Sequence, residues 1–412
     1  MLGGFLLAAA LAGGDSICDF GAVPDGCTDS TAAIQRAIDV RTASGGGVVR
    51  VPAGVFRTYT LSLKDGVELR LERGAVLKGG DDGLKYPEFG PSRFWHSERA
   101  MRRNRRAMFY TQGARNVAIT GEGTIDGNAP AFHDRNAVGW RGRWPRISHV
   151  DIPGRCLLFV ACDGVRMEGV TVVDSCGWMS WFLDCAHLEF RRITVRAHPM
   201  CCNGDGLHFG GCRDVYVGDC RLFTEDDSMI FRAHQEQMLE PHATERVLVE
   251  RCVFSSERTN GLRFGWAEDC EIRDVIVRDC VCTGSRRILS IWLPRQYGGS
   301  SDDPVRCERD PRFPLRQFVN RPFGLKNILI ENCILRGREV YDIRIGLGSR
   351  VSRFENVRLR KCLLLADLPA TVRYDTTRYP PMDFGFEDTT VMIRPWDWIR
   401  ESALRVTPFW DD

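Results

Sequence analysis

Two short acidic motifs, 21 residues apart, carry three aspartates that could do chemistry. Asp205 lies in the motif Asn-Gly-Asp-Gly, and Asp226 follows it by 21 residues, directly before Asp227. Like charges raise one another's pKa, so a cluster of carboxylates is unfavourable to assemble. Proteins usually concentrate such groups for acid–base chemistry or to hold a cation. If the chain brings these three side chains together, we expect one of those two uses.

A repeating pattern explains how residues 21 positions apart could meet. The chain repeats a phrase of two short alternating apolar runs with a polar corner between them, and the phrases begin at Asn116, Gly164, His187, Asp214, Arg246, Glu271, Asn327 and Asn356. The shorter intervals between these starts run from 23 to 32 residues. A period of this size built from strands alone is typical of a parallel β-helix. Leucine-rich repeats would need a Leu-x-x-Leu-x-Leu phrase, which is absent, and a β-sandwich would need hairpin turns of Asn-Gly type, which are rare.

Alternation within each coil predicts which side chains share the outer wall with the carboxylates. Equivalent positions of adjacent coils stack about 4.8 Å apart, and successive side chains point to opposite faces. Leu207, Phe209, Met229 and Phe231 should therefore point into the core. The same reasoning places one set of side chains outward: Trp181, Asp205, His208, Asp226, Asp227, Asn260, Arg263, Ser290 and Trp292.

Carboxylates beside aromatic and polar side chains suit the hydrolysis of glycosidic bonds. One protonated acid donates to the leaving oxygen, while ionised carboxylates orient and deprotonate a water. If acid and base stand far enough apart to admit that water, the reaction inverts the anomeric configuration. We predict Asp205, Asp226 and Asp227 as the catalytic residues. The predicted substrate-binding residues are Asn203, His208, Trp181, Asn260, Arg263 and Trp292.

The composition excludes some classes of function. The 412 residues carry a net charge of only +2, which gives no global electrostatic reason to expect binding to nucleic acid or to an acidic membrane. The 17 cysteines do not have zinc-site spacing, and many follow a polar residue at a fixed place in the repeat. We expect an inward stack of free thiols, and we predict no cofactor and no metal. The expected partner is a carbohydrate; the sequence leaves the oligomeric state open.

The predicted architecture is a single all-β domain, a right-handed parallel β-helix with a capping α-helix at its N-terminal end. The helix is expected over residues 30–43, where an N-cap precedes a stripe of apolar residues. Three segments are predicted to be long loops on one face: 79–111, 128–155 and 294–323. The predicted divisions are an apolar leader or signal segment over 1–14, the catalytic β-helix over 15–370, and a tail over 371–412 that packs on the last coil. The leader favours a secreted or periplasmic location and the free thiols a cytoplasmic one, so the location stays open.

Several motifs resemble glycoside hydrolase family 28, the polygalacturonase family of the pectin-lyase-like superfamily. The opening DFGAVPDGCTDSTAAIQRAID resembles the N-terminal phrase of that superfamily, which is shared by hydrolases, lyases and phage tailspikes. The run PGRCLLFVACDGVRMEGVTVVDSCGWMSWFLDC is similar to the segment before the catalytic coils of the family. The Asn-Thr-Asp-Gly of the family appears here as NGDG, and its Gly/Gln-Asp-Asp as EDD. This resemblance implies that Asp226 is the general acid and that Asp205 and Asp227 position and activate water.

Two departures from the family pattern concern sugar recognition. The Gly-His-Gly of the family aligns with TNG, so Asn260 replaces the histidine, and its Arg-Ile-Lys aligns with Ser290-Ile291-Trp292. In the family, that arginine and lysine are thought to bind the galacturonate carboxylate. Their loss predicts a hydrolase that is not an ordinary polygalacturonase, with Arg263 as a replacement cation. The alternatives are a non-catalytic carbohydrate-binding β-helix, and a polysaccharide lyase or epimerase on the same fold.

Overall fold

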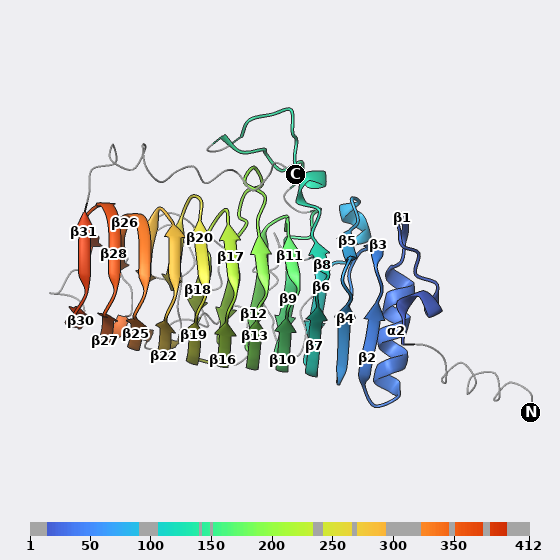
Figure 1. The fold of residues 1–412 in the computed structure, drawn as a ribbon, viewed down its shortest axis with the longest axis horizontal. Helices are drawn as coiled ribbons and strands as arrows, with labels where there is room; N and C mark the ends of the chain where they lie inside the picture. The colour runs from blue at the N-terminus through green and yellow to red at the C-terminus, as the bar shows by residue number, and fades with distance from the viewer. Residues whose placement is uncertain are drawn as a thin grey trace, which may run out of the picture.

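Parallel strands make up nearly all of the regular structure. The computed structural model describes residues 15–89, 106–139, 142–148, 151–233, 242–265, 270–293, 323–345, 351–373 and 380–393. The predicted leader over 1–14 and most of the predicted loop over 294–323 lie outside these residues. Figure 1 shows the strands side by side along one axis, with helix α2 (Thr31–Ala43) at the N-terminal end. The predicted right-handed parallel β-helix with its capping helix is confirmed.

Three rows of parallel strands form the walls of the solenoid. One row is an 11-stranded sheet: β2 (Gly47–Val51), β4 (Val67–Leu71), β7 (Arg115–Gly121), β10 (Asp163–Glu168), β13 (Ala186–Arg191), β16 (Arg213–Gly218), β19 (Thr244–Glu250), β22 (Glu271–Arg278), β25 (Phe323–Glu331), β27 (Val351–Arg360) and β30 (Phe384–Glu387). The other two rows belong to a 20-stranded sheet. We call one of them the site row: β6 (Ala107–Gln112), β9 (Arg155–Val160), β12 (Trp178–Leu183), β15 (Leu207–Gly210), β18 (Met229–Arg232), β21 (Asn260–Phe264), β24 (Arg287–Leu293), the second half of β26 (Ile334–Ile345) and β29 (Thr371–Arg373).

The remaining row completes each coil. It consists of β1 (Asp25–Asp29), β3 (Gly54–Thr58), β5 (Ala75–Gly79), β8 (Thr124–Asp126), β11 (Thr171–Val173), β14 (Thr194–Arg196), β17 (Arg221–Thr224), β20 (Val253–Ser256), β23 (Val281–Gly284), the first half of β26, β28 (Leu363–Leu368) and β31 (Thr390–Ile393). Short 3-10 turns lie at Ile17–Phe20, Gly83–Lys85 and Ala129–Phe132. Strands β30 and β31 pair in parallel with β27 and β28, so the solenoid continues beyond residue 370, where the sequence predicted its end.

Helix α2 covers the first coil. Its buried side chains, Ala33, Ile34, Ala37 and Ile38, recur at helical spacing and form one apolar stripe toward β2 and β4. The helix stops at a run of glycines with positive φ. Gly46 is required there, because a Cβ atom would come 2.6 Å from the carbonyl oxygen of Gly66. The helix thus protects the open end of the core, as terminal repeats of a solenoid must.

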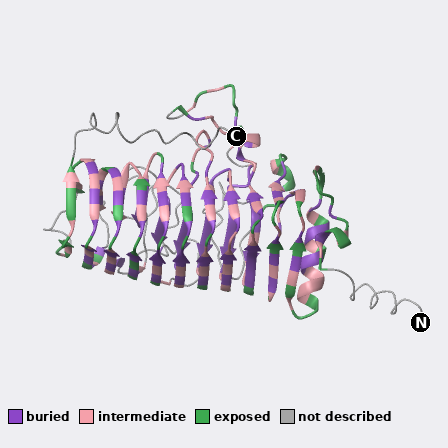
Figure 2. Ribbon diagram, in the orientation of Figure 1, coloured by how far each residue is buried: buried purple, intermediate pink, exposed green. Residues whose placement is uncertain are grey.

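Inward-facing side chains stack along the solenoid axis. Five phenylalanines on successive strands of the site row are fully buried, with ring centroids 4.9 to 6.0 Å apart: Phe159, Phe182, Phe209, Phe231 and Phe264. Figure 2 shows the same alternation of buried and exposed positions along the strands. Such columns fix the register between coils, since a slip by one residue would turn every ring outward.

The cysteines form two inward stacks where one was expected. Cys162, Cys185 and Cys212 follow strands of the site row, while Cys220, Cys252, Cys280, Cys333 and Cys362 follow strands of the 11-stranded sheet. All cysteines that the structure describes are free. In the second stack each thiol follows a residue with positive φ, such as Asp219 or Asp279, so a small apolar side chain fills the inside of that turn. Among the described helices, none has the length and apolarity needed to cross a membrane.

Candidate active site

The solenoid brings the three predicted aspartates together. Leu207 of β15 pairs with Met229 of β18, so Asp205 and Asp227 stand at matching positions two residues earlier on adjacent coils. The backbone N–H of Gly206 donates to the carbonyl of Asp227 at 2.8 Å. One carboxylate oxygen from each aspartate lies within 4.8 Å of the other two. The predicted convergence of Asp205, Asp226 and Asp227 is therefore present.

Asp227 is held on both of its oxygens. Its Oδ1 accepts hydrogen bonds from the backbone N–H of Asn260 at 3.2 Å and from the amide side chain of the same residue. Its Oδ2 lies 2.5 Å from Nη1 of Arg263. Only 2% of Asp227 is exposed. Both oxygens of Asp227 are therefore occupied by donors, one of them charged.

Asp226 occupies a different environment. It is more exposed than Asp205 and Asp227. Among the described residues, its Oδ1 accepts hydrogen bonds from the Thr259 hydroxyl at 2.8 Å and from the Asp227 backbone N–H at 3.0 Å. Burial and then the charge of Asp227 raise the pKa of Asp226, while Thr259 and Arg263 oppose the rise. A raised pKa favours the protonated carboxyl, which is the form that a proton donor needs.

Asp205 is the third member. It is 5% exposed, and its Oδ1 is buried with no hydrogen-bond partner among the described residues. Burial raises its pKa well above the usual range, followed by the charges of Asp226 and Asp227; Arg155 and Arg263 act in the opposite direction. An unsatisfied buried carboxylate oxygen is costly unless a water or substrate group fills the position. Since the pKa values of Asp205 and Asp226 are both raised, these two carboxyls retain protons at a pH where separate aspartates would be ionised.

The same oxygens could in principle bridge a cation. A calcium ion takes six to eight oxygen ligands, whereas three carboxylates supply few, and the Arg263 guanidinium already lies against Asp227. A fixed positive charge at that position disfavours a second cation. The donor set is therefore better suited to proton transfer than to metal binding.

The aromatic side of the site is more buried than alternation alone predicts. Trp181 and His208 do lie on the outer side of the site row, yet they are only 3% and 1% exposed. Trp178 covers His208 with ring centroids 4.4 Å apart, and the Arg155 guanidinium stacks 3.7 Å from the Trp178 ring. Both side chains are buried, and of these four residues only Trp178 is partly exposed.

The remaining predicted residues lie at the rim or beyond the carboxylates. Asn203 is exposed, with a positive φ of 61°. Trp292 is half-buried, and the guanidinium of Arg263 lies 5.4 Å from its ring centroid. Ser290 pairs in register with Arg263 and is 5% exposed.

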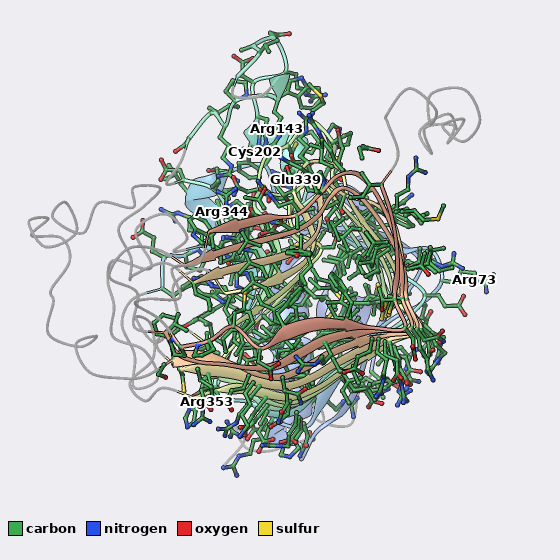
Figure 3. All side chains as sticks on the ribbon, turned by 90° about the vertical axis from the view of Figure 1, so that its left-hand side faces the viewer. Arg73, Arg143, Cys202, Glu339, Arg344 and Arg353 are labelled. Carbon is green, nitrogen blue, oxygen red and sulfur yellow. The ribbon has the colours of Figure 1, made fainter. Side chains whose placement is uncertain are left out.

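A network of arginines and acids continues the site row and was not assigned a role from the sequence. Asn260 pairs with Arg287, which pairs with Glu339 on the next coil. Nε of Arg287 lies 2.9 Å from Asp342 Oδ2, and Nε of Arg344 lies 2.7 Å from Asp342 Oδ1. Figure 3 shows Glu339 and Arg344 on one side of the coil, well away from Arg73. The insertion before β25 hides this register in the sequence.

Two family models match the chain. The model described as "Rhamnogalacturonase A/epimerase, pectate lyase-like" matches residues 16–70, and "Glycosyl hydrolases family 28" matches residues 50–249, which include all three aspartates. Matches to mannuronan C5-epimerases of Azotobacter vinelandii are short, for example 57% identity over 42 residues, or 10% of this chain. They give no support for an epimerase beyond that segment.

Relatives and solved structures agree with the longer model. A probable polygalacturonase of Vitis vinifera is 24% identical over 78% of this chain and 70% of its own length. An exo-poly-alpha-D-galacturonosidase of Dickeya chrysanthemi is 38% identical over 54% of this chain, which spans 42% of that protein. The fold is similar to that of an exopolygalacturonase from Thermotoga maritima, with a TM-score of 0.67, 20% identity and coverage of 91% of both chains. The similarity to glycoside hydrolase family 28 thus covers residues 50–249, the part of the solenoid that carries the aspartate cluster.

Proposed function

We propose that this protein hydrolyses a glycosidic bond in a pectin-like glycan that contains acidic sugars. Asp226 donates a proton to the leaving oxygen, Asp227 accepts a proton from the attacking water, and Asp205 positions that water. The observation that carries the proposal is the contrast between Asp226, which is partly exposed and has a raised pKa, and Asp227, whose oxygens are both held by donors. Paired carboxyls in contrasting environments are how one site supplies both an acid and a base.

The unsatisfied oxygen of Asp205 supports the position of the water. Oδ1 of Asp205 is buried beside Asp227, so a water between the two carboxylates would satisfy it and be oriented by both. Asp227 is unsuited to form a covalent glycosyl intermediate, because Asn260 and Arg263 occupy its oxygens. We therefore propose single displacement with inversion, although the carboxylates stand closer than the roughly 6.5–9.5 Å typical of inverting enzymes.

Positive charge around the carboxylates favours an acidic substrate. Arg155, Arg232 and Arg263 lie on one stretch of the site row, and Arg287 and Arg344 follow on the next coils. The names of the relatives refer to galacturonic acid polymers, which points in the same direction. We propose that arginines on these strands replace the missing Arg-Ile-Lys in holding a sugar carboxylate. Galacturonate-containing chains with altered recognition are accordingly our preferred substrates.

A product analysis tests the function and its stereochemistry. Purified protein is incubated with polygalacturonate, oligogalacturonates and neutral pectic side-chain oligosaccharides, and new reducing ends are measured. NMR of the first product formed reports the anomer. We expect cleavage of an acidic substrate with inversion, and a fall in kcat of at least about 10²-fold in Asp226→Asn. A product with retained configuration would overturn the single displacement, and an unsaturated product that absorbs in the ultraviolet would identify a lyase instead.

A further inference from the structure

A fourth carboxylate, Glu225, lies directly before the catalytic pair and is buried. Glu225 is 1% exposed. It pairs with Arg143, which comes from an inserted segment and is also 1% exposed. The Arg143 guanidinium forms an ion pair with Glu225 Oε1, and Nε of Arg258 lies 3.6 Å from the same oxygen. Glu225 Oε2 accepts the backbone N–H of Gly204 at 3.3 Å.

Arg143 comes from a segment that stands outside the regular coils. Residues 142–148, which we call the strap, belong to the insertion between β8 and β9, the teal segment above the solenoid in Figure 1. The backbone N–H of Trp144 donates to the carbonyl of Met200 at 3.0 Å, and Nη2 of Arg146 donates to the carbonyl of Cys202 at 2.9 Å. In Figure 3, Arg143 and Cys202 lie at the same edge of the coil. The strap thus docks on the segment that leads into Asp205.

The strap and Glu225 contact both turns that carry the catalytic aspartates, the turn before Asp205 and the turn at Asp226. Gly204 precedes Asp205, and its carbonyl accepts the backbone N–H groups of Glu225 and Asp226 at 3.1 and 3.3 Å. A buried ion pair is unfavourable to form unless its geometry is well satisfied, and breaking it by removing one partner leaves a charge without compensation. A role at the neighbouring site explains why this pair is present.

We propose that Arg143 and Glu225 are positioning residues for catalysis: their buried ion pair clamps the strap onto the catalytic corner and sets the charge beside Asp226. The proposal rests on the proposed role of Asp226 as proton donor. The charged and titratable groups that face Asp226 are Asp205, Asp227, Arg263 and Arg143, and those that face Glu225 are Arg143, Arg258 and Asp226. The positive charge of Arg143 lowers the pKa of Asp226, whereas a negative charge on Glu225 would raise it, so the two residues act on that proton in opposite directions.

The sign of each shift follows from the charges. The Arg143 guanidinium lowers the pKa of Asp226, so Arg143→Gln moves loss of its proton to higher pH. Glu225→Gln removes a neighbouring negative charge, so proton loss from Asp226 moves to lower pH. The double variant removes both charges and returns close to the wild type. Burial, and then the charge of Asp226, raise the pKa of Glu225 to about 7, while Arg143 and Arg258 oppose the rise.

The test compares four variants in the full-length protein. Arg143→Gln, Glu225→Gln and the double variant are measured with Arg135→Gln, which removes an exposed arginine of the same insertion. The alkaline limb of kcat/KM for an oligogalacturonate should move up for the first and down for the second by on the order of half a pH unit or more. The double variant and Arg135→Gln should keep the limb of the wild type. Shifts of the alkaline limb in the same direction in both single variants, or a shift in Arg135→Gln, would overturn the proposal. Loosened packing alone would not move the limb in opposite directions in the two single variants.

A second readout needs no turnover. Carbon-13 labelling of aspartate and glutamate carboxyls follows their titration directly, and Asp226→Asn identifies the Asp226 signal by its loss. The same opposite shifts are expected in that signal. If these shifts occur but no substrate is cleaved, the proposed hydrolysis is wrong and the role of the Arg143–Glu225 pair is supported. If cleavage occurs and Asp226 titrates identically in all variants, the role of the pair is wrong and the proposed hydrolysis is supported.

Discussion

Arg263 reaches back from β21 to the preceding coil and places Nη1 2.5 Å from Oδ2 of Asp227. The guanidinium is anchored on its other side, since its Nε donates to the carbonyl of Gly265 at 3.2 Å. Arg263 also lowers the pKa values of Asp205 and Asp226. One cation therefore faces all three carboxylates and offsets the repulsion that assembling them creates.

Replacing Arg263 should impair catalysis more than folding. Arg263→Ala leaves Asp227 without its charge partner, and we expect kcat/KM to fall by about 10²–10³, as for the loss of one aligned donor in other active sites. The alkaline limb should also move to higher pH, because the pKa values of Asp205 and Asp226 rise. A matched control is Arg273→Ala, which removes an arginine that pairs with Glu245 and Glu271 on the 11-stranded sheet. Equal falls in kcat/KM in the two variants would show that Arg263 contributes no more to catalysis than an arginine on the surface of the 11-stranded sheet.

The proton donor has a direct test. Asp226→Asn keeps the shape of the side chain and its bond from Thr259 but removes the exchangeable proton. General acid catalysis contributes typically 10²–10⁴-fold, so we expect kcat to fall at least 10²-fold while oligosaccharide affinity, measured by calorimetry, changes little. The thermal unfolding midpoint serves as the folding control. Full activity in this variant would assign the donor to another group.

Much of this arrangement follows from alternation in the sequence, and the limits of that reasoning are physical. The inward positions of Leu207, Phe209, Met229 and Phe231 were predicted and are confirmed, because burial of one face strongly specifies register. Arg143 could not be predicted, because an inserted segment has no repeat to place it. Glu225 belongs to the triplet EDD, but its ion pair with Arg143 could not be predicted from the sequence.

The depth of burial was also beyond the sequence. Alternation placed Trp181 and His208 outward, yet their covering by Trp178 and Arg155 depends on how long side chains fold over the strand, which period two does not specify. The salt-bridge network of Arg287, Asp342 and Arg344 was hidden for another reason. The insertion over 294–322 separates β24 from its partner β26, so the pairing that brings these residues together has no fixed spacing.

The aromatic column should carry much of the stability beneath the site. Phe231 stacks between Phe209 and Phe264, with centroids 6.0 and 4.9 Å away, and is fully buried. Phe231→Ala removes a buried ring from a close-packed core and should lower the free energy of unfolding by about 3–5 kcal/mol. Phe386→Ala is the control, since Phe386 is 40% exposed and the loss of its ring should change stability less. Chemical denaturation of both variants gives the comparison; similar losses would show that the column does not set stability.

The carboxylate cluster should make stability depend on pH. Burial and the neighbouring aspartates raise the pKa of Asp205 in the folded state, so its contribution to stability is fully present below the unfolded pKa and is lost as the pH rises through the folded value. Asp205→Asn has no proton to lose. We expect it to melt higher than the wild type at pH 8, by roughly a few degrees, and to match it near pH 4. Calorimetry at both values, with Asp274→Asn on the exposed surface as control, measures the difference. If Asp205→Asn is less stable than the wild type at pH 8, contacts to ionised Asp205 outweigh the unfavourable free energy of its burial, and the prediction is wrong.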